Sequence, residues 1–506
     1  MERIGHWIDG RLAPGRSGRT ASVWDPTTGQ QQAEVDLADA DVVDAAVASA
    51  GQAAAGWADT PLGARTSVLF AFRELLAANR KALAEVVSRE HGKTAADADG
   101  EIARALDNVE FACGLTSHLE GRYTEGVSRG IDVHAVRAPL GVVAGITPFN
   151  FPAMVPMWMI PTALACGNAF VLKPSERDPS ASLLLADLLR QAGLPDGVLN
   201  VVQGDRIAVE RLLEHPDVQA ISFVGSTEIA RHIYATGAAH GKRVQALGGA
   251  KNHMVVLPDA DVAAAADAAV SAGYGSAGER CMSVSVVVAV GEVAEPLVEA
   301  IAERLPGIEI GTGTGGAAEM GPLITAAHRD RVASYVEDAP GEGAQVRVDG
   351  RSAPAASRPG FYLGASLLDH VRPGSRAHTE EIFGPVLSVV RVDTYDEAMA
   401  VVDATPYGNG AAIFTRDGGL ARRFSRAVQA GMVGVNVPIP VPVASHSFGG
   451  WKGSLFGDLH VYGPDGIRFY TRGKVVTSRW PEPRPETAGL PAHELDLGFP
   501  GSGGRA

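Results

Sequence analysis

Apolar positions recur along this chain with two different periods, and the period changes many times. Apolar residues at helical spacing from Leu62 to Val87 and from Glu101 to Leu119 predict two amphipathic helices. Short apolar runs at 142–144, 169–172 and 220–224 predict buried strands, with helical segments such as 179–192 and 227–237 between or after them. Strands that alternate with helices at this pitch predict a parallel, doubly wound α/β sheet.

A second alternation of strands and helices follows a glycine pair, Gly248-Gly249, where we place a domain boundary. It begins with a strand at 254–257 and ends with a strand at 433–436. Two further segments have patterns of their own. Residues 122–138 alternate like a pair of strands, and the tail 481–506 is rich in Pro, Gly and Glu, which predicts disorder.

One apolar stretch, Gly141 to Leu172, has the length of a membrane span. Four prolines interrupt it, and Asn150 lies inside it. A soluble core crossed by turns explains this pattern better than a helix in lipid.

Composition restricts the possible partners and compartment. The 506 residues are enough for two or three domains, and 46% hydrophobic with 20% charged residues is typical of a soluble protein. The net charge of −14 argues against nucleic acid and anionic membranes as partners. Three cysteines form no disulfide framework, and residues 1–10 contain no apolar signal region, so we expect a cytoplasmic protein.

Cys281 is the candidate nucleophile. It lies between a glycine-containing loop, Ser276 to Arg280, and a strand-like run, Val284 to Val290. A thiol in this place can be held rigidly and still meet a substrate. The alternative, a buried structural cysteine, is the commoner fate of a lone cysteine.

Two turns predict a dinucleotide site at one sheet edge. Gly225-Ser226-Thr227-Glu228 closes a strand and opens a helix, where backbone N–H groups favour a phosphate, although a plain capping turn has the same pattern. Lys173-Pro174-Ser175-Glu176 follows another strand of that sheet, where ligands bind. The Glu176 carboxylate can accept from a ribose 2′-hydroxyl and would repel a 2′-phosphate, which favours NAD over NADP. Both side chains could instead be solvated loop residues.

Three further motifs carry weaker signals. Prolines on both sides of Phe149-Asn150-Phe151 would aim the Asn150 amide, which suits it to stabilise an oxyanion, or it is a turn asparagine. Glu381 precedes a tight turn into a strand and could bind a ribose or be solvated. The segment 311–316 matches G-x-G-x-x-G, but no amphipathic helix follows, so we interpret it as a loop.

In this order along the chain, the motifs at Asn150, Lys173–Glu176, Gly225–Glu228, Cys281 and Glu381–Pro385 resemble the aldehyde dehydrogenase superfamily over about residues 5 to 480. The resemblance implies an α/β fold with three parts. They are a Rossmann-like NAD domain (1–120 and 139–248), an α/β catalytic domain (249–445) and a small β oligomerisation flap (121–138 and 460–480), within an expected homotetramer.

The resemblance also implies roles for single residues. Cys281 attacks the aldehyde to form a thiohemiacetal, Asn150 and the Cys281 backbone N–H stabilise the oxyanion, and hydride transfer to NAD leaves a thioester. No metal is implied. The implied NAD-binding residues are Phe149, Lys173, Glu176, Arg177, Gly225, Ser226, Gly248 and Glu381.

One departure from the superfamily changes the expected reaction. Hydrolytic members carry a general-base glutamate before Leu-Gly-Gly, but the candidate positions here are Ala246 or Leu247, depending on the alignment. Water, with a pKa of about 15.7, is a poor nucleophile without a base. A thiol, with a pKa of about 8.5, is a far better one. The missing carboxylate therefore favours coenzyme A as acyl acceptor.

The segments Gly249–His253, Gly278–Met282 and Phe469–Trp480 resemble the branch of the superfamily that acylates coenzyme A from methylmalonate or malonate semialdehyde with loss of CO2. The substrate carboxylate then needs a cation, and Arg280 and Arg104 are the candidates, since guanidinium binds carboxylate through two hydrogen bonds. Arg280 is also expected to help lower the thiol pKa. A hydrolytic dehydrogenase and a catalytically silent NAD-binding protein remain the alternatives, and the choice between the two semialdehydes stays open.

Overall fold

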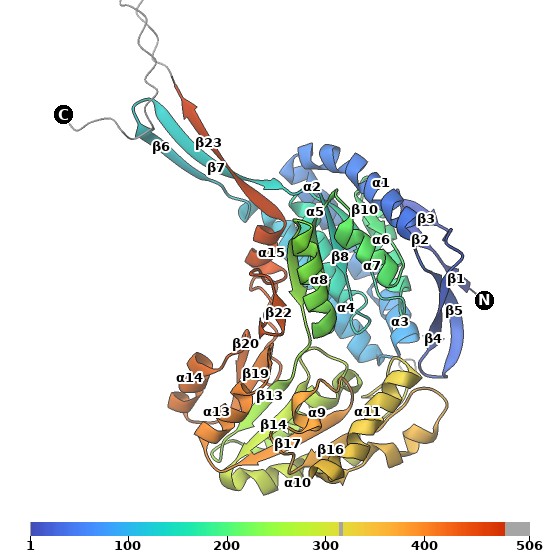
Figure 1. Ribbon diagram of the computed structural model, residues 1–506, viewed down its shortest axis with the longest axis vertical. Coiled ribbons are helices and arrows are strands. Elements are labelled where there is room, and N and C mark those ends of the chain that lie inside the picture. Colours follow the sequence, from blue (N-terminus) through green and yellow to red (C-terminus); the bar gives the residue numbers. More distant parts are fainter. Residues whose placement is uncertain (1, 313–316, 481–506) are drawn as a thin grey trace, which may run out of the picture.

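The structure, a computed structural model, describes residues 2–312 and 317–480. It consists of two open α/β sheets, one above the other in Figure 1, and a long three-stranded flap that projects from the upper one. The tail 481–506, which we expect to be disordered, lies outside the described residues. So do residues 313–316 of the G-x-G-x-x-G pattern.

The upper sheet has eight strands, and its centre is parallel. The two outer strand pairs β10–β2 and β2–β3, and the pair β12–β22, are antiparallel. Its strands in spatial order are β22 (Leu455–Phe456), β12 (Arg243–Leu247), β11 (Val218–Val224), β8 (Val142–Ile146), β9 (Ala169–Lys173), β10 (Leu199–Val201), β2 (His6–Ile8) and β3 (Arg11–Ala13). The first predicted alternation is therefore confirmed.

Helices cover both faces of this sheet, because its strands bury apolar side chains on each side. One face packs against α1 (Ala40–Asp59), α7 (Arg206–Glu214) and α8 (Thr227–Ala239). The other packs against α2 (Leu62–Ala78), α3 (Arg80–His91), α4 (Ala95–Cys113), α5 (Met154–Ala165), α6 (Ser180–Gln191) and α15 (Gly463–Phe469). A small sheet of β1 (Glu2–Ile4), β5 (Gln30–Asp36) and β4 (Thr20–Asp25) lies at the edge.

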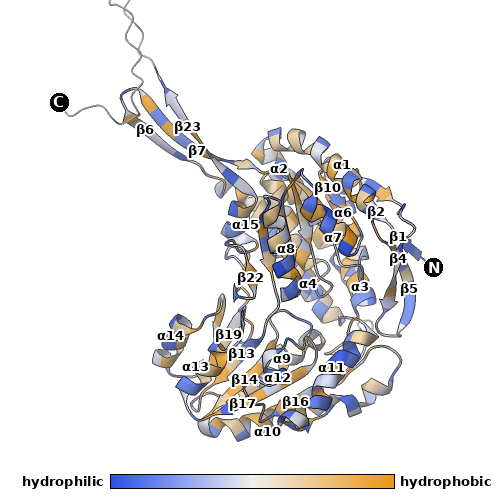
Figure 2. Ribbon diagram, viewed as in Figure 1, coloured by the Kyte–Doolittle hydropathy of each residue, from blue (hydrophilic) through white to orange (hydrophobic). Residues whose placement is uncertain are grey.

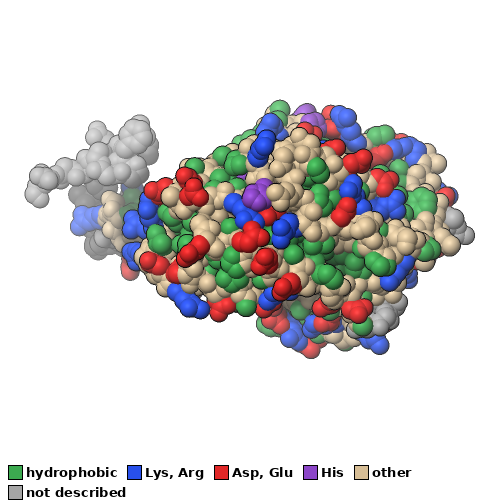
Figure 3. Space-filling view, turned by 90° about the horizontal axis from the view of Figure 1, so that it is seen from below, with side chains coloured by type: hydrophobic (Ala, Val, Ile, Leu, Met, Phe, Trp, Pro, Cys, Tyr) green, Lys and Arg blue, Asp and Glu red, His purple; other side chains and the backbone are tan. Residues whose placement is uncertain are grey.

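The lower sheet has seven strands, and only the pair β15–β16 is antiparallel. Its strands in order are β15 (Gln345–Val348), β16 (Ser366–Asp369), β17 (Val386–Val392), β14 (Val284–Val290), β13 (Asn252–Val256), β19 (Gly410–Phe414) and β20 (Met432–Val435). The central strands are strongly apolar (Figure 2) because both faces are covered. The covering helices are α9 (Val262–Tyr274), α10 (Ala294–Arg304), α11 (Ala326–Asp338), α12 (Arg376–Thr379), α13 (Tyr395–Asp403) and α14 (Gly418–Ala427). Acidic and basic side chains intermingle on the lower end of the molecule, where these helices meet solvent (Figure 3).

The flap is an antiparallel sheet in the order β23 (Thr471–Arg479), β7 (Ile131–Pro139) and β6 (Arg122–Ser128). Of the segment 460–480, which we expected in the flap, only the part from Thr471 onward forms a flap strand. Residues Gly463–Phe469 form helix α15 instead, because Ile467 and Phe469 are buried against the core around α5. Strands β18 (Tyr407–Gly408) and β21 (Trp451–Lys452) pair with each other as a two-stranded antiparallel sheet.

Two long apolar stretches of the chain are each divided into several elements. The single helix expected over Leu62–Val87 is two helices, because Asn79 leaves helical geometry (φ −99°, ψ 9°) and its side chain bonds back to Leu75 O at 2.8 Å. The apolar stretch 141–172 is a strand, a helix and a strand, and Pro161 lies inside the helix. Within the described part of the chain, no helix has the length and apolarity needed to cross a membrane.

Candidate active site

The loop that carries Cys281 has an unusual backbone. Ser276, Ala277 and Gly278 have positive φ angles of 54°, 53° and 71° in succession. Left-handed backbone is costly for residues other than glycine, and such strain persists where the surrounding structure fixes it. Gly278 packs so closely that a Cβ there would lie 2.2 Å from Gly384 O. The turn therefore holds Cys281 just before β14.

Two asparagine side chains hold the backbone of Cys281 itself. Asn252 Nδ2 donates to Cys281 O at 2.9 Å, and Asn409 Nδ2 donates to the same oxygen at 3.0 Å. Asn252 begins β13 and Asn409 lies just before β19, so two neighbouring strands of the lower sheet fix the Cys281 loop. Sequence reasoning missed Asn409, which no local motif marks.

A cavity of about 230 Å³ lies beside Cys281. Its lining contains both charged and apolar side chains. The charged residues are Lys93, Asp97, Glu101, Arg104 and Arg280, and the apolar ones include Phe151, Met154, Trp158, Met282 and Phe448. Both predicted carboxylate-binding arginines therefore line the cavity that contains the predicted nucleophile, although Arg104 and Arg280 are 176 positions apart in the chain (280 − 104). The Arg104 side chain is 43% exposed and has a loose ion pair of 3.5 Å with Asp107.

Asn150 lies next to the Cys281 loop, as an oxyanion donor must. Its Nδ2 donates to Glu279 O at 3.0 Å, and the second hydrogen on this nitrogen is available to a substrate oxygen. Beneath it, Lys93 Nζ donates to Asn150 O and to Glu101 at 2.6 Å. Sequence reasoning missed Lys93 and Glu101, because nothing local distinguishes them from solvated surface charges.

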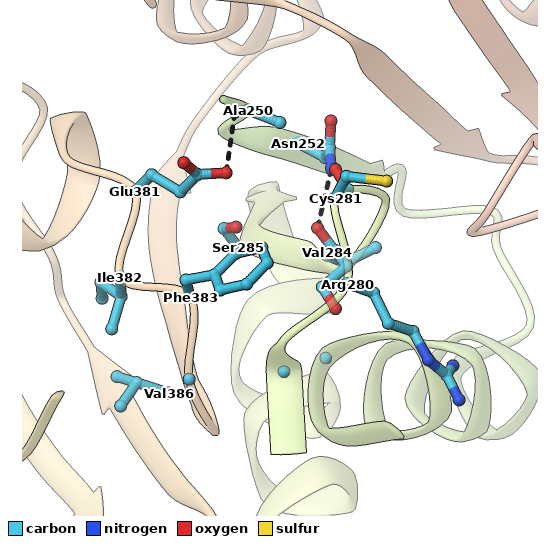
Figure 4. A pocket seen from close by; sticks show the side chains of 14 residues that line it. Ala250, Asn252, Arg280, Cys281, Val284, Ser285, Glu381, Ile382, Phe383 and Val386 are labelled. Atoms are coloured by element: carbon cyan, nitrogen blue, oxygen red, sulfur yellow. Dashed lines mark hydrogen bonds between the residues drawn. The ribbon is translucent and has the colours of Figure 1, made fainter. Parts of the chain in front are cut away.

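The thiol of Cys281 has a raised pKa of about 12. Burial is the main cause, and the charge of Glu381 adds to it. The lowered thiol pKa that we expected beside Arg280 is not found, because burial dominates. Its side chain extends away from the Cys281 sulfur (Figure 4) and its guanidinium bonds to Asp97.

The predicted cofactor residues collect at one edge of the upper sheet, where parallel strands β8, β9, β11 and β12 end. Ser226 is the exposed N-cap of α8 but makes no side-chain capping bond, so its hydroxyl faces solvent rather than closing the helix. Next to it, Thr227 Oγ1 accepts from Gly249 N at 2.9 Å. A Cβ on Gly248 would lie 2.7 Å from Gly453 O, so this wall admits no side chain.

Glu381 continues this edge. Its Oε1 accepts from Ala250 N at 2.9 Å (Figure 4), and a Cβ on Gly249 would lie 2.4 Å from its Oε2. Burial raises the pKa of Glu381 to about 7, and burial lowers the pKa of nearby Lys251 to about 7. The backbone of residues 248–250 therefore contacts both Thr227, at the N-terminus of α8, and the Glu381 carboxyl group.

Lys173 and Glu176 form an ion pair of 3.1 Å at the end of β9, with Lys173 buried and Glu176 half-buried. Burial acts to raise the Glu176 pKa, but the charges of Lys173 and Arg177 and the hydrogen bonds to the carboxylate together outweigh it, and the pKa is lowered. Farther along, the Arg177 guanidinium lies 4.9 Å from the centre of the Phe149 ring. Phe149 also meets Phe383 edge to face at 5.9 Å, so this pair lies beside the Glu381 loop.

The structure shows which of the two candidate positions, Ala246 and Leu247, lies on the Cys281 side of β12. Leu247 packs in the hydrophobic cluster that reaches Cys281, whereas Ala246 packs in the cluster on the opposite face of the sheet. Neighbouring residues of a strand point to opposite faces. Leu247 is therefore the position on the Cys281 side, and it is apolar.

The chain matches the model of the Aldehyde dehydrogenase family over residues 13–476. It therefore belongs to the aldehyde dehydrogenase family and is an oxidoreductase. It is 53% identical to a malonate-semialdehyde dehydrogenase of Pseudomonas aeruginosa over 484 residues, which cover 95% of this chain and 97% of the relative. It is 48% identical to malonate-semialdehyde dehydrogenase 2 of Geobacillus kaustophilus, with 95% and 99% covered.

The fold agrees with solved structures. The methylmalonate-semialdehyde dehydrogenase of Oceanimonas doudoroffii superposes with a TM-score of 0.94 at 51% identity, covering 96% of this chain and 99% of that one. A Sinorhizobium meliloti protein complexed with NAD has the same TM-score, identity and coverage. The predicted family and fold are thus confirmed.

Proposed function

We propose that this enzyme oxidises malonate or methylmalonate semialdehyde with NAD and transfers the acyl group to coenzyme A. The products are CO2, NADH and acetyl-CoA or propionyl-CoA, respectively. The observation that carries this proposal is the cavity in which Arg104, Arg280 and Cys281 meet. Two arginines in the same cavity as a thiol suit an aldehyde that also bears a carboxylate. The relatives named for malonate semialdehyde support the same substrate class.

The chemistry begins at Cys281. Its thiolate attacks the aldehyde carbon, and the oxyanion accepts hydrogen bonds from Asn150 Nδ2 and from the Cys281 backbone N–H. Such donors stabilise charge where it develops. Arg104 and Arg280 hold the carboxylate and so orient the carbonyl toward the sulfur. Because the free thiol has a raised pKa, its ionisation is coupled to the binding of ligands that change the charge around it.

The sheet edge suits NAD. An exposed helix N-terminus with a free serine hydroxyl fits the pyrophosphate, and the Lys173–Glu176 pair fits a ribose. NAD would be held by the residues predicted above, from Phe149 and Arg177 to Gly248 and Glu381, and when bound it supplies the hydride acceptor. We therefore assign residues 1–120 and 139–248 to the NAD-binding domain and residues 249–445 to the catalytic domain.

Coenzyme A is the proposed acyl acceptor because no carboxylate occupies the general-base position. Leu247 leaves the Cys281 thioester without a side chain there that could deprotonate water. The coenzyme A thiol ionises far more easily and is intrinsically more nucleophilic. The substrate loses CO2 only after Cys281 has been acylated. Its carboxylate is therefore still present during the oxidation step, where the enzyme can recognise it.

The flap has exposed apolar side chains that include Tyr123, Val136 and Val475, at 62%, 42% and 67% exposure. Exposed apolar area on a projecting sheet is typical of an assembly surface. We propose a cytoplasmic homotetramer in which residues 121–138 and the last strand mediate association. Its mass in solution tests this.

The decisive experiment measures NADH formation from malonate semialdehyde with and without coenzyme A, and identifies the product by mass spectrometry. We expect multiple turnovers and acetyl-CoA with coenzyme A, and a single burst of NADH without it. Sustained turnover to a free acid without coenzyme A would establish the hydrolytic alternative. Cys281→Ala is the control for the nucleophile and should show neither burst nor turnover.

A further inference from the structure

Asp97 lies in the first turn of α4 and shares the cavity wall with Arg104, Arg280 and Cys281. Its Oδ1 accepts a hydrogen bond from Arg280 Nη2. The two side chains are 15% and 24% exposed, so the pair is mostly shielded from water. Among residues 2–312 and 317–480, only the side chain of Asp97 is hydrogen-bonded to the Arg280 guanidinium.

Gly275 also packs closely against the Arg280 guanidinium. A Cβ added at Gly275 would lie 2.6 Å from Arg280 Nη1, 2.8 Å from Cζ and 2.9 Å from Nη2. Real Cβ atoms essentially never make contacts this short, so any other side chain at position 275 would displace the guanidinium. Asp97 and Gly275 thus both restrict the position of the Arg280 guanidinium.

An acidic residue at this place works against simple charge attraction. The cavity wall has three cations, Lys93, Arg104 and Arg280, and two anions, Asp97 and Glu101. A carboxylate substrate would be attracted more strongly if Asp97 were neutral, since like charges repel. The buried Oδ2 of Asp97 has no hydrogen-bond partner among the described residues, which adds to its cost. That Asp97 occupies this position despite both costs indicates that it positions a neighbouring group.

We infer that Asp97 and Gly275 hold the Arg280 guanidinium in the orientation that binds the substrate carboxylate. They are positioning residues that act through Arg280, and this inference rests on the proposed function. An arginine fork that is already oriented loses less freedom when it binds a carboxylate than a mobile one does. The remaining N–H donors of Arg280 are left for the substrate.

The test compares the KM values for malonate semialdehyde and for propanal in four variants. Asp97→Ala and Gly275→Ala should each raise the KM for malonate semialdehyde by about tenfold, as expected for a lost charge-assisted hydrogen bond. The KM for propanal, which has no carboxylate, should change by less than about twofold. Asp97→Asn keeps an acceptor oxygen and should restore most of the discrimination.

Asp99→Ala is the matched control. Asp99 lies on the same helix and also pairs with an arginine, Arg80, but it is not part of the cavity wall. This variant should leave both KM values unchanged. Thermal melting of each variant identifies any that fails to fold, and Gly275→Ala then carries the test if Asp97→Ala does not fold.

Two outcomes would overturn the inference while the proposed function stands. A lower KM for malonate semialdehyde in Asp97→Ala would show that Asp97 only repels the substrate. Equal changes for both aldehydes would show a general structural role. If the wild-type enzyme forms acetyl-CoA but does not prefer malonate semialdehyde to propanal, carboxylate recognition itself fails and the positioning role fails with it.

Discussion

Lys93 and Glu101 form an ion pair of 2.6 Å with both side chains almost completely buried, 1% and 0% exposed. The pair links three parts of the site. Lys93 also donates to Asn150 O, and Glu101 Oε1 accepts from Ala153 N at 2.8 Å and from Met154 N at 3.0 Å. Asn150, the proposed oxyanion donor, is therefore held by a charge pair that connects α4 with the start of α5.

Breaking this pair should affect both stability and turnover. Glu101→Ala leaves the Lys93 ammonium buried and unpaired, and we expect the free energy of unfolding to fall by about 3–5 kcal/mol. The value of kcat should fall as well, because the Asn150 loop loses its support. Urea unfolding and steady-state kinetics measure the two effects. Glu110→Ala, on the exposed side of the same helix, should change little, and equal losses in both variants would contradict the role.

A carboxylate at position 247 should open the hydrolytic route. Leu247→Glu places a general base on the face of β12 that packs toward Cys281. A positioned base contributes about 10²–10⁴-fold, so NADH turnover without coenzyme A should rise at least about tenfold. The comparison variant is Ala246→Glu, which buries a carboxylate on the other face and should destabilise the protein without hydrolytic gain. Hydrolysis by Ala246→Glu alone would reverse the assignment.

NAD affinity should depend on pH through Glu381. Burial raises the pKa of this carboxyl to about 7, so it is mostly protonated below that value. A carboxylate accepts from a ribose hydroxyl better than a protonated acid does, and the Kd of NAD should therefore rise as pH falls from 8 to 6. Fluorescence titration measures this, and Glu381→Gln should flatten the profile. In Glu380→Gln, which changes a neighbouring carboxylate of lowered pKa, the pH profile should stay as in the wild type.

Glu279 should make stability fall as pH rises. Its carboxyl is completely buried, its Oε2 has no hydrogen-bond partner among the described residues, and burial raises its pKa to about 8. The groups that face it are His91 Nε2 at 3.9 Å, His328 Nε2 at 3.4 Å and Ile324 N at 3.3 Å. Both histidines have lowered pKa values through burial and are neutral at pH 7.

The sign follows from proton binding. The folded state holds the Glu279 proton up to about pH 8, whereas the unfolded chain releases it near the ordinary value of 4.5. Folding therefore takes up a proton between these values, and stability falls as pH rises toward 8. Glu279→Gln cannot ionise, so its Tm should decline less than that of the wild type between pH 6.5 and 8. Identical Tm profiles would show that Glu279 has an ordinary pKa.

Local sequence was sufficient to predict the strands and helices whose apolar residues recur at regular spacing. The strand–helix alternation predicted both sheets, because a buried parallel strand must be apolar on both faces and a covering helix on only one. The exceptions were places where packing overrode propensity. Asn79 split a continuous helical pattern, and Ile467 and Phe469 were taken into a helix at the core rather than into the flap strand.

The sequence by itself determined the fold class and the family and predicted Cys281 as the nucleophile, since these depend on residue types in a fixed order. Only the tertiary structure decided which side of β12 faces Cys281, that Lys93 and Glu101 support Asn150, and that Asp97 and Gly275 enclose Arg280. The physical reason is that these relationships join residues up to 183 positions apart. Their energies come from burial and pairing across elements, which no local pattern of hydrophobic and polar residues encodes.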